Sequence, residues 1–287
     1  MRRRKFFATL EFVQIQEQSE LIENAIDPDK PSWGGGIAFG FWIISVLFVV
    51  IIPAIFLMPY AMMQNPPVIE SEALVEFAKN DKNAITIQIL AIIPAHLLTL
   101  LLAWLIVTRV RKDSFTEALG WKSGGVRWWF YPVIIVGFFA LALVASSIYP
   151  EQENDLIRMI QSSKAALISV ALLATFTAPI VEELVYRGVM YSAFQKALGV
   201  PAAFALVTFL FALVHVPQYW PSYSTIALIL LLSCILTWLR IYSKNLWPCI
   251  VLHTIFNGLQ SLGLIASSYV DKKDPAVDAA FFLELLK

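Results

Sequence analysis

The stretch AALISVALLATFTAPIVEELVYR, residues 165–187, joins a long apolar run to two adjacent glutamates and an arginine. The run from Ala165 to Val181 contains no ionisable side chain, and Glu182, Glu183 and Arg187 follow it directly. A helix that crosses a bilayer needs about 20 apolar residues. An ionisable side chain at bilayer depth costs at least a few kcal/mol, so its presence indicates a functional site. This stretch therefore predicts a membrane helix that carries chemically active groups.

The composition of the whole chain supports a membrane protein. Of its 287 residues, 59% are hydrophobic and 15% are charged, and the mean hydropathy is +0.71. Soluble domains contain about 25% charged residues. The formal net charge is zero and no basic stripe follows residues 2–5, so nucleic acid is not an expected partner.

Apolar runs long enough to cross a bilayer recur along the chain, and we predict an all-α polytopic membrane helix bundle of about seven transmembrane helices. The expected spans are Ile37–Met62, Ala84–Val107, Tyr131–Ile148, Ala165–Val181, Val200–Val216, Thr225–Tyr242 and Leu246–Ser268. The segment Ala276–Leu286 is too short and too polar to span, and it predicts a surface helix.

Basic residues gather in alternate connecting segments. They precede the first span and lie between spans 2 and 3, 4 and 5, and 6 and 7, whereas the segments between spans 1 and 2 and between spans 3 and 4 are acidic. Cytoplasmic loops carry an excess of Lys and Arg. This alternation predicts an integral membrane protein whose N-terminus lies in the cytoplasm.

Helix periodicity gives the two glutamates different surroundings. Glu183 and Arg187 are four residues apart, so they share a helix face and can form an ion pair. Glu182 lies about 100° around the helix and is left free, as a general base for water requires. Pro179, just upstream, lacks an N–H and should distort the helix near the glutamates. The alternative is that the acidic pair only caps a helix end.

A predicted hairpin brings a histidine toward this pair. Gly199 and Pro201 mark a turn between two helices, and His215 follows the turn by nearly as many residues as Glu182 precedes it. In an antiparallel helix pair the two side chains reach similar depth. A carboxylate and an imidazole at one level can together activate water, although a lone intramembrane histidine can also be structural.

Two further polar residues lie one helical turn apart in the last span. His253 and Asn257 can both donate hydrogen bonds in one direction, which suits the oxyanion formed when water attacks a carbonyl, an effect of about 3–4 kcal/mol per donor. The alternative is a polar clasp between helices, contributing about 1 kcal/mol or less. His96, beside Pro94, has no acidic or amide neighbour at helical spacing, and we expect it to be structural, for example by bonding a carbonyl that the proline leaves free.

These residues form three ordered motifs. Glu182 to Arg187 matches EExxxR, Phe211 to His215 matches FxxxH, and His253 to Asn257 matches HxxxN. In this order on successive membrane helices they resemble the CPBP family of intramembrane proteases, which includes CAAX prenyl endopeptidases of the Rce1 type and the Abi group of bacteriocin-processing or self-immunity proteins. On this basis we divide the chain into a polar cytoplasmic leader (1–35), two N-terminal transmembrane helices (36–110), a CPBP-like catalytic membrane domain (111–268) and a polar tail (269–287).

The resemblance implies a function for each motif residue. Glu182 would activate water with the help of His215, His253 and Asn257 would form the oxyanion site, and Glu183 and Arg187 would support the centre. It implies a peptide or protein substrate, which could be lipidated, cleaved near the cytoplasmic face of what we expect to be a prokaryotic cell membrane. No cofactor is required by this mechanism. Glu182, His215 and His253 could alternatively supply a zinc site, although the chain has no HExxH motif.

Two other classes of function are compatible with these residues. The chain could be a non-hydrolytic immunity or regulatory factor that binds a peptide or partner protein through the same cavity. It could also be a transporter in which Glu182 and the histidines relay protons, but that class favours broken helices or an inverted repeat, and neither is evident.

Overall fold

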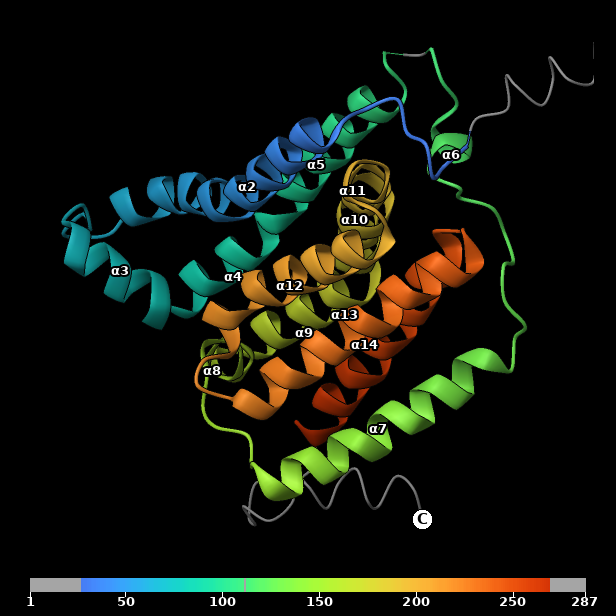
Figure 1. Ribbon diagram of the computed structural model, residues 1–287. Coiled ribbons are helices and arrows are strands. Elements are labelled where there is room, and N and C mark those ends of the chain that lie inside the picture. The colour runs from blue at the N-terminus through green and yellow to red at the C-terminus, as the bar shows by residue number, and fades with distance from the viewer. Residues whose placement is uncertain (1–26, 111, 269–287) are drawn as a thin grey trace, which may run out of the picture.

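The computed structural model describes residues 27–110 and 112–268 (Figure 1). Within these residues the secondary structure is helical, with no strands, and seven helical stretches are long and apolar enough to cross a membrane, which confirms the predicted fold class. They are α2 (Gly35–Met62), α4 with α5 (Lys82–Leu90 and Ile92–Val107), α7 (Phe130–Ile148), Lys164–Leu198, α12 (Val200–Tyr219), α13 (Tyr223–Ser243) and α14 (Trp247–Ser267). Shorter helices are α3 (Ser71–Asn80), α6 (Phe115–Ala118) and α8 (Asp155–Ser162).

The fourth stretch is longer than the span predicted from its apolar run alone. It consists of α9 (Lys164–Leu172), α10 (Ala178–Glu183) and α11 (Tyr191–Leu198), joined by the π-helical segments η1 (Leu173–Thr177) and η2 (Leu184–Met190). This stretch has 35 residues. At a rise of about 1.5 Å per residue its length exceeds the roughly 30 Å thickness of the hydrocarbon core of a bilayer. Glu182 therefore lies near the middle of a continuous helical stretch rather than at a helix end.

Prolines and a glycine explain where several helices begin, end or change geometry. Pro94 has no N–H for the carbonyl of Leu90, and α4 ends at that residue. Gly199 adopts a φ of +82° between α11 and α12, and the Gly199–Pro201 turn is placed as predicted. At η1 the N–H of Ala178 donates to the carbonyl of Leu173, five residues back.

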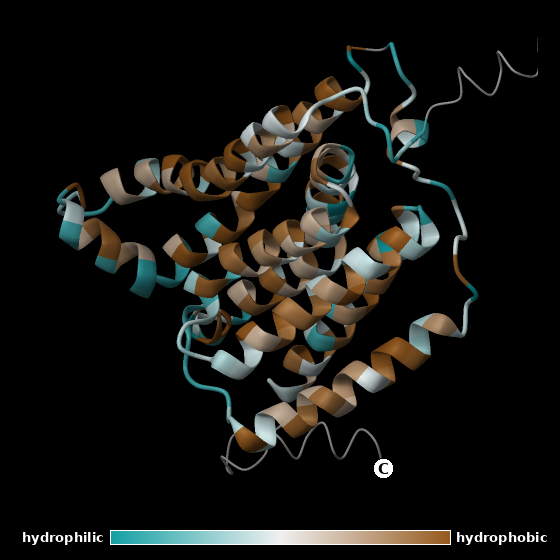
Figure 2. Ribbon diagram, in the orientation of Figure 1, coloured by the Kyte–Doolittle hydropathy of each residue, from teal (hydrophilic) through white to brown (hydrophobic). Residues whose placement is uncertain are grey.

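The long helices pack around the Lys164–Leu198 stretch. In Figure 1, α2 and α5 run side by side along one edge of the bundle and α7 lies along the opposite edge. Hydrophobic residues cover these outer helices along their length, as Figure 2 shows. Val133 and Val136 of α7 are largely exposed, as expected for side chains that face lipid, whereas Phe138 packs inward against Phe256.

Residues 27–34, here called the N-terminal strap, lie against the C-terminal part of the Lys164–Leu198 stretch before α2 begins. The Trp33 indole donates to the Val189 carbonyl at 3.0 Å, and Lys196 Nζ donates to the Pro31 carbonyl at 2.8 Å. Asp29 Oδ1 lies 3.2 Å from Nη1 of Arg240, whose side chain is fully buried on α13. The strap therefore contacts η2, α11 and α13. The rest of the predicted leader and the predicted Ala276–Leu286 helix lie outside the described residues.

Candidate active site

The ion pair expected from the EExxxR spacing is present and completely buried. Arg187 Nη1 donates to Glu183 Oε1 at 2.9 Å, and both side chains are 0% exposed. Two buried charges lose their hydration, so such a pair is stable only with further hydrogen bonds. Arg187 makes these with α13, through Nη2 to the Oγ and carbonyl of Ser233 and through Nε to Thr237. The pair thus fixes this helix against α13.

The guanidinium of Arg187 also lies over an aromatic ring of the FxxxH motif. Its Cζ is 4.6 Å from the centroid of Phe211, a distance at which a desolvated cation is attracted to the ring face. Gly188 follows Arg187 and faces Leu119, and a Cβ there would stand 3.0 Å from the Leu119 Cδ2. The small residue after the motif therefore permits close packing with the segment before α7.

His253 reaches both glutamates from α14. Its Nδ1 is 2.8 Å from Glu183 Oε1, and its Nε2 is 3.7 Å from Glu182 Oε2. A carboxylate accepts only, so Nδ1 carries the proton in this contact. The Oε2 of Glu183 has no hydrogen-bond partner among the described groups, so Oε1 alone accepts from both Arg187 and His253. Glu183 thereby sets the orientation of the His253 ring toward Glu182.

The two adjacent glutamates differ in accessibility. The Glu182 side chain is 26% exposed, whereas that of Glu183 is 0% exposed and fully engaged at Oε1. Glu182 makes no hydrogen bond that would immobilise its carboxylate within the described part of the chain, and its nearest ionisable contact is His253. One carboxylate is therefore committed to structure, and the other is available to a ligand or to water.

His215 is oriented by its own helix. Its Nδ1 donates to the Phe211 carbonyl at 2.7 Å, which leaves Nε2 as the free ring nitrogen. The ring stacks obliquely on Phe211, with 4.7 Å between centroids. No ion pair or hydrogen bond joins His215 to Glu182 in the described structure, and the side chain beside Glu182 is His253 of α14.

Asn257 contacts the widened turn of the motif helix. Its Nδ2 donates to the Ala174 carbonyl in η1 at 2.9 Å. In the π-helical register the partner of that carbonyl would be residue 179, and Pro179 has no N–H. Asn257 therefore satisfies a carbonyl that the proline leaves without a backbone donor, and its second amide hydrogen remains available.

Two residues of the N-terminal helices, Trp42 and His96, bond to the helical stretch that carries Glu182. Tyr186, one turn after Glu182, accepts a hydrogen bond from Trp42 of α2 at 3.0 Å and packs edge-on against Phe211. His96 of α5 bonds Thr177 of η1 at 3.0 Å rather than a carbonyl of its own helix, which corrects our expectation for it. Intramembrane polarity identified His96 as unusual, but spacing gave no indication of its partner.

The proposed zinc ligands do not come together as a set. Among residues 27–110 and 112–268, no group of three or more His, Cys, Asp or Glu side chains is placed to hold a metal ion. Glu182 and His253 approach each other, while His215 is turned by its bond to Phe211. The arrangement does not fit a three-ligand zinc centre, and no step below passes through a metal.

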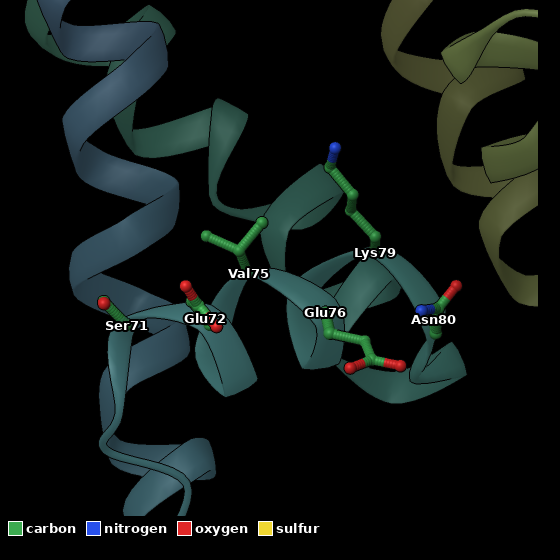
Figure 3. Close-up of a pocket in the computed structure, with 6 residues that line it drawn as sticks. All are labelled: Ser71, Glu72, Val75, Glu76, Lys79 and Asn80. Atoms are coloured by element: carbon green, nitrogen blue, oxygen red, sulfur yellow. The ribbon is translucent and has the colours of Figure 1, made fainter.

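A surface pocket lies along α3, well separated in sequence from the motif helices. Its lining consists of Ser71, Glu72, Val75, Glu76, Lys79 and Asn80 (Figure 3). Every one of these residues comes from α3, which has no buried residue, and none belongs to the three motifs. We do not assign the reaction to this pocket.

Comparison with known proteins identifies the region that contains the site. Residues 164–259 match the family model described as Type II CAAX prenyl endopeptidase Rce1-like. The match begins with the first residue of α9 and ends within α14, so it includes all three motifs. It confirms the resemblance inferred from them. Comparison with curated proteins and with solved structures gives no match.

Proposed function

Because residues 164–259 form an Rce1-like domain, characteristic of the CAAX-type intramembrane protease family, we propose that this integral membrane protein is an endopeptidase in which Glu182 activates water. The substrate is a peptide bond of a membrane-associated protein or peptide. Lipid modification of the substrate is compatible with entry from the bilayer. The basic connecting segments favour a site that opens toward the cytoplasm.

One observation carries this proposal: the two adjacent glutamates differ in burial and in hydrogen bonding. Glu183 is fully buried and bound by Arg187 and His253, whereas Glu182 is partly exposed and faces the second nitrogen of the same imidazole. A general base must have a free carboxylate within reach of water. Glu182 meets that requirement, and Glu183 with Arg187 supplies the fixed support.

The reaction follows from these positions. Glu182 takes a proton from a water molecule, and the resulting hydroxide adds to the carbonyl carbon of the scissile bond. The negative charge that develops on the carbonyl oxygen is stabilised by the free amide hydrogen of Asn257, and by Nε2–H of His253 when that imidazole is protonated on both nitrogens. When the C–N bond breaks, the proton held by Glu182 passes to the leaving amine, and His215 can carry it through its free Nε2.

The test is cleavage of a membrane-peptide library by the purified protein in detergent. Removal of a general base lowers the rate by about 10²- to 10⁴-fold, so Glu182→Gln should lose cleavage while remaining folded. Glu76→Gln is the matched control, because Glu76 is an exposed glutamate of α3 outside the motifs. Cleavage retained by Glu182→Gln would refute the assignment of the base.

Each reaction is repeated with a strong chelator, followed by added zinc. The metal-free mechanism predicts the same rate in all three conditions. A loss on chelation with recovery on zinc addition would reassign Glu182, His215 and His253 as metal ligands. If no peptide is cleaved, while the protein and its Glu182→Gln variant bind the same peptide, a non-hydrolytic binding factor becomes the better description.

A further inference from the structure

His96 lies outside the region matched by the Rce1-like family, yet it is bonded to the helix that carries Glu182. It belongs to α5 and is 8% exposed, and its Nδ1 is 3.0 Å from the Thr177 hydroxyl. A histidine of the N-terminal helices is therefore part of the surroundings of the site.

The direction of this hydrogen bond follows from the hydroxyl. Thr177 Oγ1 donates its single hydrogen to the Leu173 carbonyl at 3.2 Å. With the hydroxyl hydrogen assigned to that carbonyl, the same oxygen accepts from His96, and we assign the imidazole proton to Nδ1 on this basis. His96 thus links α5 to the end of η1 through a donor of fixed position.

The turn that His96 contacts determines which way Glu182 points. A π-helical turn accommodates one residue more than an α-helical turn, and each residue advances the helix by about 100°. If η1 relaxed to α-helix, Glu182 would rotate by about that angle relative to Ala171. On the other side η1 is held by α14, through Asn257 to the Ala174 carbonyl and through Ser261 to Thr175.

We propose that His96 is a positioning residue for Glu182: its Nδ1–H holds the Thr177 hydroxyl and so keeps η1 in the π-helical form that directs the carboxylate into the site. This inference rests on the proposed role of Glu182 as the base. By this proposal α5, which carries none of the three motifs, contributes to the reaction through His96.

The experiment compares substitutions of His96 that keep or remove a hydrogen-bond donor at the position of Nδ1. Asparagine offers an amide N–H near the position of Nδ1, whereas glutamine offers one near the position of Nε2. Small displacements of reacting groups lower rates by about 10- to 100-fold, so His96→Leu and Thr177→Val should each lower kcat by that factor with KM little changed. His96→Asn should recover most of the loss, and His96→Gln should not.

Thr99→Val is the matched control on α5. Thr99 is also buried and polar, but its hydroxyl bonds the Ala95 carbonyl of its own helix rather than η1. Its replacement should leave kcat unchanged. Equal losses in Thr99→Val and His96→Leu would show that α5 acts only through general packing and would overturn the proposal, as would equal rescue by Asn and Gln.

Hydrogen exchange gives a readout that does not depend on catalysis. His96→Leu should accelerate exchange of the backbone amides of 173–183 while leaving α13 unchanged, and His96→Asn should restore protection. If these changes occur in a protein that cleaves no peptide, the hold of His96 on η1 is established and the proposed function fails. If Glu182→Gln abolishes cleavage but His96→Leu alters neither kcat nor exchange, the proposed function survives and the inference fails.

Discussion

The stability of the fold should depend strongly on keeping both partners of the buried Glu183–Arg187 ion pair. Breaking a buried ion pair leaves an unpaired charge and costs about 3–5 kcal/mol. Arg187→Met leaves the Glu183 carboxylate without its cation in a site with 0% exposure. We expect this variant to unfold at a clearly lower temperature in detergent. Adding Glu183→Gln should recover part of the loss, since the buried charge is then removed.

The surface pair Arg158–Asp155 provides the comparison for that measurement. Its side chains are 61% and 51% exposed, and such pairs contribute about 0–1 kcal/mol. Arg158→Met should therefore barely change the unfolding midpoint. Strictly additive effects of Glu183→Gln and Arg187→Met would contradict the idea that an uncompensated charge causes the loss.

At this scale the sequence predicts local contacts better than distant ones. The Glu183–Arg187 bond follows from a four-residue spacing, because helix geometry places such residues together. The bond from His253 to Glu183 crosses 70 residues of chain, and it depends on how α14 packs against α10. Motif order indicated that His253 belongs to the site, but spacing did not indicate which glutamate it bonds.

The π-helical segment η1 is bonded by side chains of two other helices, α5 and α14. Its Ala174 carbonyl faces Pro179 in the π-helical register and is satisfied by Asn257. Asn257→Ala should lower stability by about 1 kcal/mol or less, the usual value of such bonds between membrane helices. In a Pro179→Ala background the cost should shrink, because residue 179 then has an N–H for the same carbonyl. Unfolding in detergent measures both.

An unchanged cost of Asn257→Ala in the two backgrounds would disprove this account of the Ala174 carbonyl. Sequence reasoning located the distortion at Pro179 but not its form. Hydrophobic periodicity describes a regular helix of 3.6 residues per turn, and a π-helical turn departs from it by one residue. Its presence depends on Asn257 and Thr177 finding partners on separate helices.

For the whole molecule, composition was sufficient to predict the seven membrane helices, because each apolar run must reach across a bilayer. Composition did not predict that the N-terminal strap bonds to η2, α11 and α13.

The contact between the strap and α13 can be tested at Asp29. We expect Asp29→Asn to leave Arg240 buried without a carboxylate and to accelerate hydrogen exchange in 27–35. Asp27→Asn is the control, since Asp27 pairs with exposed Lys30 at 3.9 Å and accepts from the Asp29 N–H at 2.9 Å, a bond that the asparagine oxygen can keep. Equal exchange in both variants would exclude a role for Arg240 in holding the strap.

The contacts of the motif helix impose an order on the biosynthesis of the protein. The glutamates are made in the fourth span, but the imidazole that contacts both of them and the amide that satisfies η1 arrive with the seventh. A nascent chain that has delivered only its first six helices to the membrane has two carboxylates without these partners. If Glu182 is the base that we propose, hydrolytic competence should therefore appear only after α14 has left the ribosome and inserted.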